Sequence, residues 1–465
     1  MSKCIRLLLV ATAICVLWSA GPPQAWAAGD PVASKASKRS YTFESARGPG
    51  DVDRVAVVLE VQGKLKSPGE AKVEQSKMDV RATVVYDERT LETPDDGKGP
   101  LRSIRHYDQA EARLDVAEGN LEPRLRGQRK LMGVEIDGAK VTLFSPHGEL
   151  TRDELDLVDL LANSLLVDRF LPGRPVAQGG TWTHADELII AAFGLDRIAK
   201  NTITSKLASV DDDSAMIEMS GRINGAINGV PTEIEVKGKY RFGRKTRRVD
   251  WFGLLVRENR EVGPVAPGFD VVARLRMQIK PRDEAEQLTD AALADLPLKP
   301  NGRLTQLVYA PDQGGWRFQH DRRWFLTGSD RELAFLRLID RGDLVAQCNV
   351  AALSPVEPGK QATLEQFQKD IKEALGENFG EFVSAGQKAN DQDYRVLNAV
   401  VRGTVSSLPI EWHYYLVADE HGRQVTFTFT VEGPLAERLG QMDRQMVESL
   451  RFDEPKVAMH DKSTP

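Results

Sequence analysis

Cys348 is the first candidate for nucleophilic chemistry, because Cys4 and Cys15 lie in an N-terminal segment that we expect to be removed. A cysteine nucleophile needs solvent exposure and a nearby cation that lowers its pKa. Cys348 instead alternates with the apolar residues Leu344 and Val350, so it lies on the apolar face of an expected strand. The spacing therefore predicts a buried and unreactive thiol.

His413 and Tyr415 form a second candidate, a polar pair on an expected strand over residues 411–418. Neighbouring residues of a strand point to opposite faces, so these two side chains share one face and Trp412 and Tyr414 take the other. The pair could form a small polar site, but we expect an ordinary sheet histidine that is half exposed.

Aromatic side chains gather at the start of the same region. Trp316, Phe318 and Trp324 are close in the sequence, and aromatic residues with a polar atom are enriched at protein interfaces. We predict an interaction patch that combines these three residues with His413 and Tyr415. The alternative is that the three aromatic residues pack in a core.

Three charged clusters could bind ions, and each has a simpler interpretation as a solvated turn. Asp211–Asp213 offers carboxylates, but calcium needs about six to eight oxygen ligands. The basic run Arg244–Arg248 could contact phosphate, and His320–Arg323 combines a histidine with an acid. The 7 histidines are scattered singly, whereas metal sites need clustered ligands. The sequence therefore predicts no metal site.

Motifs of common enzyme classes are missing from the sequence. It contains no Gly-x-Ser-x-Gly elbow, no phosphate-binding loop of the Walker type, no Gly-x-Gly-x-x-Gly after a strand and no His-Glu-x-x-His. We therefore expect a protein that is not an enzyme and needs no cofactor.

The first 27 residues have the three parts of a secretory signal peptide. Two basic residues precede an apolar run, and Ala25 and Ala27 supply the small residues that predict cleavage before Ala28. The run is shorter than the roughly 20 residues that cross a bilayer, and no later stretch is apolar for so long. We expect a secreted or periplasmic mature protein without a transmembrane segment.

Charge narrows the class of partner. The formal net charge is −6, and loss of the basic signal peptide makes the mature chain more negative. An acidic surface argues against nucleic acid as a partner. The expected partner is an unknown protein or an apolar small molecule.

Composition and pattern divide the 465 residues into six segments. A proline-rich stretch separates two expected folded units, which we call the first unit and the second unit. The predicted segments are a signal peptide (1–27), a flexible lead-in (28–50), the first unit (51–281), a linker (282–302), the second unit (303–454) and a disordered tail (455–465).

The first unit reads as a large antiparallel sheet with one apolar face. Strict alternation predicts strands over 55–61, 78–86, 232–242 and 271–279, and Asp137-Gly138 and Asn228-Gly229 predict hairpin turns. Two helices are expected to cover the sheet. One begins at Thr151 with a capping box and runs to Pro172, and the other covers about 184–200.

The second unit combines helices and strands. Apolar stripes predict helices over 364–375 and 435–450, and alternation predicts strands over 344–350, 394–404, 411–418 and 424–431. With both units together, the predicted fold class is α+β.

The second unit resembles the PsbP-like fold, known from the extrinsic subunit of photosystem II and from many bacterial exported proteins. The resemblance covers about 150 residues and implies an α/β sandwich that acts as a binding or assembly module. The matching features are Trp316-Arg317-Phe318, Trp324, the helix 364–375, Tyr394-Arg395-Val396, the aromatic strand Trp412–Leu416 and Ser449-Leu450-Arg451-Phe452.

The first unit looks like the LolA-like half-barrel class of envelope proteins, in which a curved sheet and helices enclose an apolar cavity that holds lipid. Gly179-Gly180-Thr181-Trp182, before the second expected helix, is the one motif-like piece. The resemblance implies a cavity lined by inward residues of the sheet. The candidates are Val57, Leu59, Val80, Val84, Ile234, Val236, Tyr240, Leu275 and Met277.

Three functions remain open at this point. The first is an exported envelope protein that acts in protein interaction or assembly, without enzymatic activity. The second is a carrier of an apolar, lipid-like ligand in the half-barrel. The third is an enzyme of a kind that the motifs do not identify.

Overall fold

The computed structural model describes residues 39–68, 72–94, 99–116, 119–312, 314–357 and 360–453. The predicted signal peptide, its cleavage site at Ala28 and the predicted disordered tail lie outside the described residues. The described residues are mostly β, with 55% of them in strands and 14% in helices, so the predicted α+β class is wrong. The strand content is high because the strands are long and the helices are short. Strands reach 20 residues, whereas the helices of the first unit have 7 and 8.

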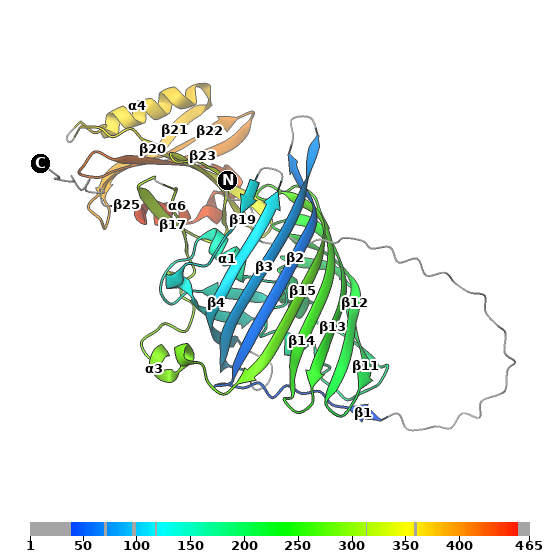
Figure 1. Ribbon diagram of the computed structural model, residues 1–465. Coiled ribbons are helices and arrows are strands. Elements are labelled where there is room, and N and C mark those ends of the chain that lie inside the picture. Colours follow the sequence, from blue (N-terminus) through cyan, green and yellow to red (C-terminus); the bar gives the residue numbers. More distant parts are fainter. Residues whose placement is uncertain are drawn as a thin grey trace, which may run out of the picture.

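The first unit is built on one antiparallel sheet, which has 13 strands within the described residues. Figure 1 shows its longest strands side by side. In spatial order the strands are β7 (Lys140–Phe144), β6 (Leu131–Asp137), β4 (Leu101–Val116), β3 (Val73–Glu92), β2 (Val52–Pro68), β15 (Gly268–Arg282), β14 (Arg248–Arg260), β13 (Val230–Gly243), β12 (Ser214–Ile227), β11 (Thr204–Val210) and β9 (Thr181–Thr183), with β5 (Gly119–Leu121) on β4 and β10 (Arg197–Asn201) on β12.

Two runs of hairpins make this sheet. From β2 the chain builds outward to β7, crosses the inner side of the sheet, and then returns from β9 to β15, which pairs with β2. The predicted turns at Asp137-Gly138 and Asn228-Gly229 join β6 to β7 and β12 to β13, as expected. The pairing of β2 with β15 is therefore the seam that joins the two halves.

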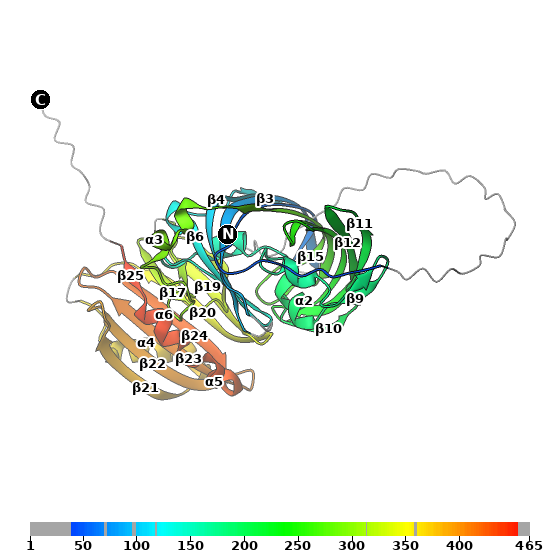
Figure 2. The same ribbon diagram turned by 90° about the horizontal axis from the view of Figure 1, so that it is seen from below.

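The inner face of the sheet is mostly apolar, apart from buried charged residues near the start of β2. The predicted alternation is confirmed, because the inward side chains of β2, β3, β13 and β15 are buried and their neighbours are more exposed. Residues 145–200 cross this concave face, and Figure 2 shows α2 (Asp186–Phe193) inside the curve of the sheet. The crossing residues and the inner face form one hydrophobic core.

The two covering helices are shorter than predicted. Thr151 and Glu154 make the expected capping box, but α1 (Arg152–Val158) ends with Asp159 as its C-cap. Ala162 then takes a left-handed φ of 52°, and η2 (Val167–Phe170) follows. The second helix ends at Gly194, which has a φ of 64°, and residues 197–201 pair with β12 as β10 instead of continuing the helix.

The predicted lead-in and linker are partly folded. Residues 39–50, expected to be flexible, include β1 (Ser40–Tyr41), which pairs with β8 (Val176–Ala177), and the buried Phe43. The linker contains η3 (Glu286–Leu288) and α3 (Asp290–Leu293), and it buries Leu288 and Leu293 against the sheet. Both segments have apolar residues that the sheet covers.

The second unit has a seven-stranded antiparallel sheet and a three-stranded one in the described part of the chain. The larger is β18 (Trp324–Ser329), β19 (Leu333–Asp340), β20 (Asp343–Leu353), β24 (Gln424–Glu432), β23 (Leu408–Ala418), β22 (Arg395–Val405) and β21 (Phe379–Ala389), and the smaller is β16 (Leu307–Tyr309), β17 (Trp316–His320) and β25 (Arg451–Phe452).

Helices cover both faces of the larger sheet. On one face α4 (Leu364–Leu375) buries Phe367 and Ile371, with η4 (Gly376–Asn378) after it. On the other face lie η5 (Gly433–Leu435), α5 (Ala436–Leu439) and α6 (Met442–Glu448). The stripe predicted as one helix over 435–450 is broken at Gly440, which has a φ of 59°. Within the described residues, no helix is long and apolar enough to cross a membrane.

The two units dock through backbone contacts. Leu150 forms a parallel bridge with Leu307, and Arg152 donates to the carbonyl oxygens of Arg322 and Trp324. Gly229 lies so close to Gly342 that a Cβ at Gly229 would be 1.9 Å from the Gly342 carbonyl oxygen. These contacts fix the start of α1 and the hairpin between β12 and β13 against the second unit.

Candidate functional site

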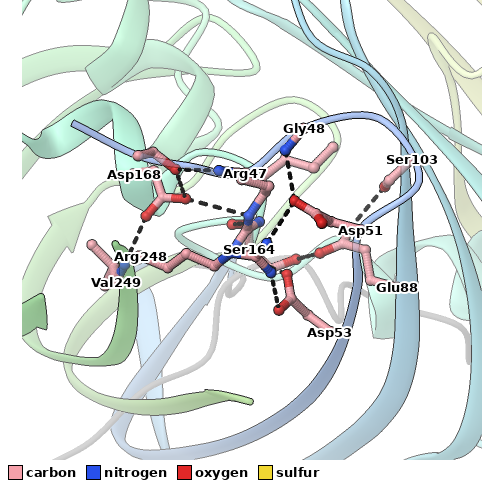
Figure 3. A network of polar contacts seen from close by, with 12 residues as sticks. Arg47, Gly48, Asp51, Asp53, Glu88, Ser103, Ser164, Asp168, Arg248 and Val249 are labelled. Carbon is pink, nitrogen blue, oxygen red and sulfur yellow. Dashed lines mark hydrogen bonds and ion pairs between the residues drawn. The ribbon is translucent and has the colours of Figure 1, made fainter. Parts of the chain in front are cut away.

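Seven charged side chains meet inside the first unit, near the start of β2, and we call them the charge network (Figure 3). They come from the N-terminal residues, the four strands β2, β3, β4 and β14, and the crossing segment. Its members are Arg47, Asp51, Asp53, Glu88, Arg105, Asp168 and Arg248.

Arg47 and Arg248 hold the first half of the network. Asp53 accepts from Arg248 Nη1 at 2.9 Å and lies 3.6 Å from Arg47 Nη2. Arg47 also pairs with Asp168 at 3.3 Å and donates to the carbonyl oxygen of Ser164 at 3.0 Å. The contacts tie residues 45–53 to the crossing segment and to β14.

Glu88 and Arg105 hold the second half. Glu88 Oε1 accepts from Arg105 Nε at 2.6 Å and from Ser103 Oγ at 2.8 Å, and Glu88 Oε2 accepts from Ser164 Oγ at 2.5 Å. The Arg105 guanidinium also lies 4.7 Å from the centroid of the Tyr86 ring. Both charged side chains are almost fully buried, at 1% and 2% exposure.

The electrostatics of the network favour ion pairing over catalysis. Burial by itself raises the pKa of Glu88, but Arg105 and Arg47 outweigh it and hold the pKa below its ordinary value. Glu88 is therefore a weak base toward the hydroxyl of Ser164, which is itself 0% exposed. Burial raises the pKa of Asp53 despite its two arginine partners, and the nearby charge of Glu88 adds to the rise.

A large open cavity adjoins the network, and we call it the base cavity. Its volume is about 1170 Å³, and Ser45, Arg47 and Asp168 of the network region form part of its wall. Residues 165–174 and 181–188 of the crossing segment form most of the rest. Within it, burial lowers the pKa of His184 to about 4, so this histidine is neutral at neutral pH. His184 Nε2 lies 2.8 Å from Ser205 Oγ.

A second cavity, the rim cavity, lies at the opposite end of β2, where the two units meet. Its volume is about 410 Å³. Leu65, Met78, Leu114 and Val116 of the first unit line it, together with the loop 262–267. Thr327 and Arg337 of the second unit complete the wall, and Arg337 Nη1 donates to the carbonyl oxygen of Pro264 at 2.5 Å.

His413 and Tyr415 do come together, around a residue that we did not predict. Asp443 of α6 is 2.6 Å from His413 Nδ1 and accepts from Tyr415 Oη at 2.6 Å. Glu411 is 2.9 Å from His413 Nε2. Burial opposes the charge of His413, but the hydrogen bonds and charges of the two carboxylates raise its pKa. Both ring nitrogens are occupied, so the group is an ion-pair cluster.

The predicted aromatic interaction patch is wrong for three of its members. Trp316, Phe318 and Trp324 have exposures of 2%, 0% and 0%, because they pack in the main core of the second unit. The alternative of core packing therefore holds for them. Cys348 lies in the same core, and burial raises the pKa of its thiol, as the unreactive assignment requires.

The predicted cavity residues lie in a filled core. Phe170 of the crossing segment packs on Tyr240 and Phe252, and Tyr240 Oη donates to its carbonyl oxygen at 2.8 Å. None of the nine candidates lines the base cavity or the rim cavity. They belong to the core cluster or pack against it: Val57, Leu59, Val80, Val84, Ile234, Val236, Tyr240, Leu275 and Met277.

The charged clusters behave mostly as turns. Asp211 accepts from the backbone nitrogens of Asp213 and Ser214, and Lys245 pairs with Asp213 at 2.7 Å. Two residues are exceptions. Arg248 belongs to the charge network, and His320 is the buried last residue of β17, with 4% exposure. Among the described residues, no group of three potential metal ligands is found.

Sequence reasoning missed the charge network, although strand parity contained a signal for it. Asp53 has the parity of the inward residues of β2, and Glu88 has the parity of those of β3. A charge at an inward position has to be paired when it is buried. The partners Arg47, Asp168 and Arg248 are distant in sequence and carry no such signal.

Comparisons with known proteins find remote structural similarity. No family model matches the sequence and no curated protein matches it. The solved structure of cyanobacterial PsbP (CyanoP) from Synechocystis sp. PCC 6803 is similar over 34% of this chain and 99% of its own, with 16% identity and a TM-score of 0.26. A Bacteroides thetaiotaomicron protein is similar over 32% of this chain and 48% of its own, with 12% identity and a TM-score of 0.24. Lipovitellin is similar over 50% of this chain and 25% of its own, with 8% identity and a TM-score of 0.28.

Proposed function

We propose that this protein is a non-enzymatic binding protein that holds the apolar part of a small molecule in the rim cavity between its two units. The observation that carries the proposal is an apolar cavity whose wall both units complete. A volume of about 410 Å³ falls in the range of small-molecule sites, which is roughly 300–1,000 Å³.

The surroundings of the rim cavity also favour an apolar ligand. Leu121, which lines it, is 40% exposed, and Val73, which is 47% exposed, pairs with the lining residue Pro68. Phe335 is 42% exposed and stands two residues before the lining residue Arg337 on β19. Exposed apolar side chains around a cavity are typical of binding sites.

This proposal moves the carrier hypothesis from the half-barrel interior, which is filled, to its rim. The LolA-like resemblance of the first unit and the PsbP-like resemblance of the second remain predictions, as does export to the periplasm or the outside of the cell. Protein interaction or assembly remains an open alternative, although the aromatic residues that suggested a patch are mostly core residues.

A neutral apolar fluorophore tests the proposal. Mature protein purified without detergent is titrated with N-phenylnaphthylamine, and native mass spectrometry records any co-purified ligand. Val116→Trp introduces a large side chain into the wall of the cavity, and Val383→Trp adds the same side chain at an exposed position of β21 as a control.

We expect saturable binding that Val116→Trp weakens at least about tenfold and Val383→Trp leaves unchanged, with both variants folded by circular dichroism. A bound adduct, if present, is expected to disappear in Val116→Trp alone. Equal affinity of the wild type and Val116→Trp for the fluorophore would overturn the proposal.

A further inference from the structure

The base cavity has a cation that the charge network does not use. Arg169 belongs to η2 and lines the cavity next to Asp168. Its guanidinium is half buried, and no carboxylate, carbonyl or hydroxyl among the described residues accepts a hydrogen bond from it. Burial alone lowers its pKa, with no opposing charge to raise it.

This situation differs from that of the other buried arginines of the first unit. Arg47, Arg105 and Arg248 all have carboxylate partners. A guanidinium has five N–H donors, and their partial removal from water costs free energy unless acceptors replace the water. Arg169 is therefore the arginine at this end of the unit that gains most from an added anion.

The neighbouring carboxylates do not supply that anion. Asp168 already accepts from Ser45 Oγ at 2.9 Å and from the Val249 backbone nitrogen at 2.8 Å, and it pairs with Arg47. Asp137 and Glu187 also line the cavity, but both are exposed, so water screens their charges.

The remaining wall offers both polar and apolar contacts. Thr93 and Thr183 supply hydroxyl groups, and Arg174 is a second, exposed cation whose Nη2 donates to the Thr181 carbonyl oxygen at 3.2 Å. The apolar contacts come from a wall made of Leu165, Leu166, Leu171, Pro172 and Leu188. The neutral His184 adds no charge.

We propose that the base cavity is a second ligand site, which binds a small organic anion with its acidic group on Arg169 and its apolar body on the leucine wall. The ligand class is an amphipathic carboxylate, sulfonate or phosphate. A planar guanidinium pairs with such groups through two parallel hydrogen bonds. The site lies at the other end of β2 from the rim cavity and does not depend on it.

The test compares two ligands that share an apolar chain and differ in their head group, which is anionic in one and neutral in the other. Octanoate and octanol have the same apolar chain, and each is titrated calorimetrically into the mature full-length protein. Anilinonaphthalene sulfonate serves as a fluorescent anionic probe in parallel. The variants are Arg169→Gln and, as a matched control with the same change of charge, Arg274→Gln at an exposed position of β15.

We expect Arg169→Gln to weaken octanoate and the sulfonate probe at least about tenfold and octanol less than about twofold, because only the ion pair is lost. Arg169→Lys should recover part of the affinity, and binding should weaken as salt increases. The proposal is overturned if Arg169→Gln binds the anions as the wild type does, if Arg274→Gln weakens them equally, or if octanol and octanoate weaken together.

Discussion

Replacement of Glu88 by Gln is expected to destabilise the first unit strongly. The carboxylate of Glu88 accepts from Ser103, Arg105 and Ser164, and Glu88 and Arg105 are almost fully buried. Glutamine removes the charge that Arg105 faces and offers one acceptor atom in place of two. Removing one partner of a buried ion pair costs about 3–5 kcal/mol, because the other charge stays buried without compensation.

That loss corresponds to a fall in melting temperature of roughly 6–20 °C for a unit of this size. Differential scanning calorimetry measures the fall, and hydrogen exchange followed by mass spectrometry locates it in the first unit. Glu233→Gln, at an exposed position of β13, makes the same chemical change and should stay within about 0.5 kcal/mol of the wild type.

The double variant Glu88→Gln with Arg105→Met gives a sharper test of the reasoning. If the cost comes from an unpaired guanidinium, removing that guanidinium should recover about 1–3 kcal/mol relative to the sum of the two single variants. The ion-pair account would be refuted if Glu88→Gln were as stable as Glu233→Gln, or if the two single effects simply added.

Three further predictions follow from other parts of the molecule. The pKa of His413 is raised, so its ion pairs stabilise the second unit while the imidazole is protonated. This stability is lost as pH rises through the raised pKa. Calorimetry between about pH 6 and 9 should show the loss in the wild type and not in His413→Gln. Gly229→Ala places a Cβ against the Gly342 carbonyl, so the units should loosen and cleavage within 282–302 by the glutamate-specific V8 protease, at the exposed Glu284 and Glu286, should become faster; an unchanged cleavage rate would contradict this contact. Cys348 should react with dithionitrobenzoate only after unfolding, and reaction in the native protein would show that the core is open.

The sequence predicted the strands of the first unit well, because alternation is a local property that burial of one sheet face imposes. It predicted the helices of the first unit poorly, although the helix expected over 364–375 is present with those bounds. The apolar spacing after Val158 is that of a helix, but Asn163 and Ser164 lie in buried contacts with Arg105, and the chain leaves the helix before it reaches them. Tertiary hydrogen bonds of this kind override local preference.

For the candidate sites too, the sequence predicts what a local pattern imposes and misses what depends on distant contacts. Strand parity predicts that His413 and Tyr415 share one face of the sheet. It does not predict their common partner Asp443, because Asp443 belongs to α6 and not to the sheet. The sheet was expected to enclose a ligand cavity. No local pattern indicates that the chain must cross the concave face to reach its far edge, and that crossing fills the expected space.

The seam between β2 and β15 has a consequence for the order in which the protein is made. Lys66 pairs with Gly268, so the two strands of the seam leave the ribosome roughly two hundred residues apart. Each half of the sheet can form from neighbouring hairpins as the chain emerges, but the first half keeps an open edge at β2 until β15 arrives. Pairing of such distant segments is slow, because a long loop has to close first. Arg248 is made only shortly before β15, so Asp53 has only one of its two arginine partners, Arg47, until the strands that complete the sheet are synthesised.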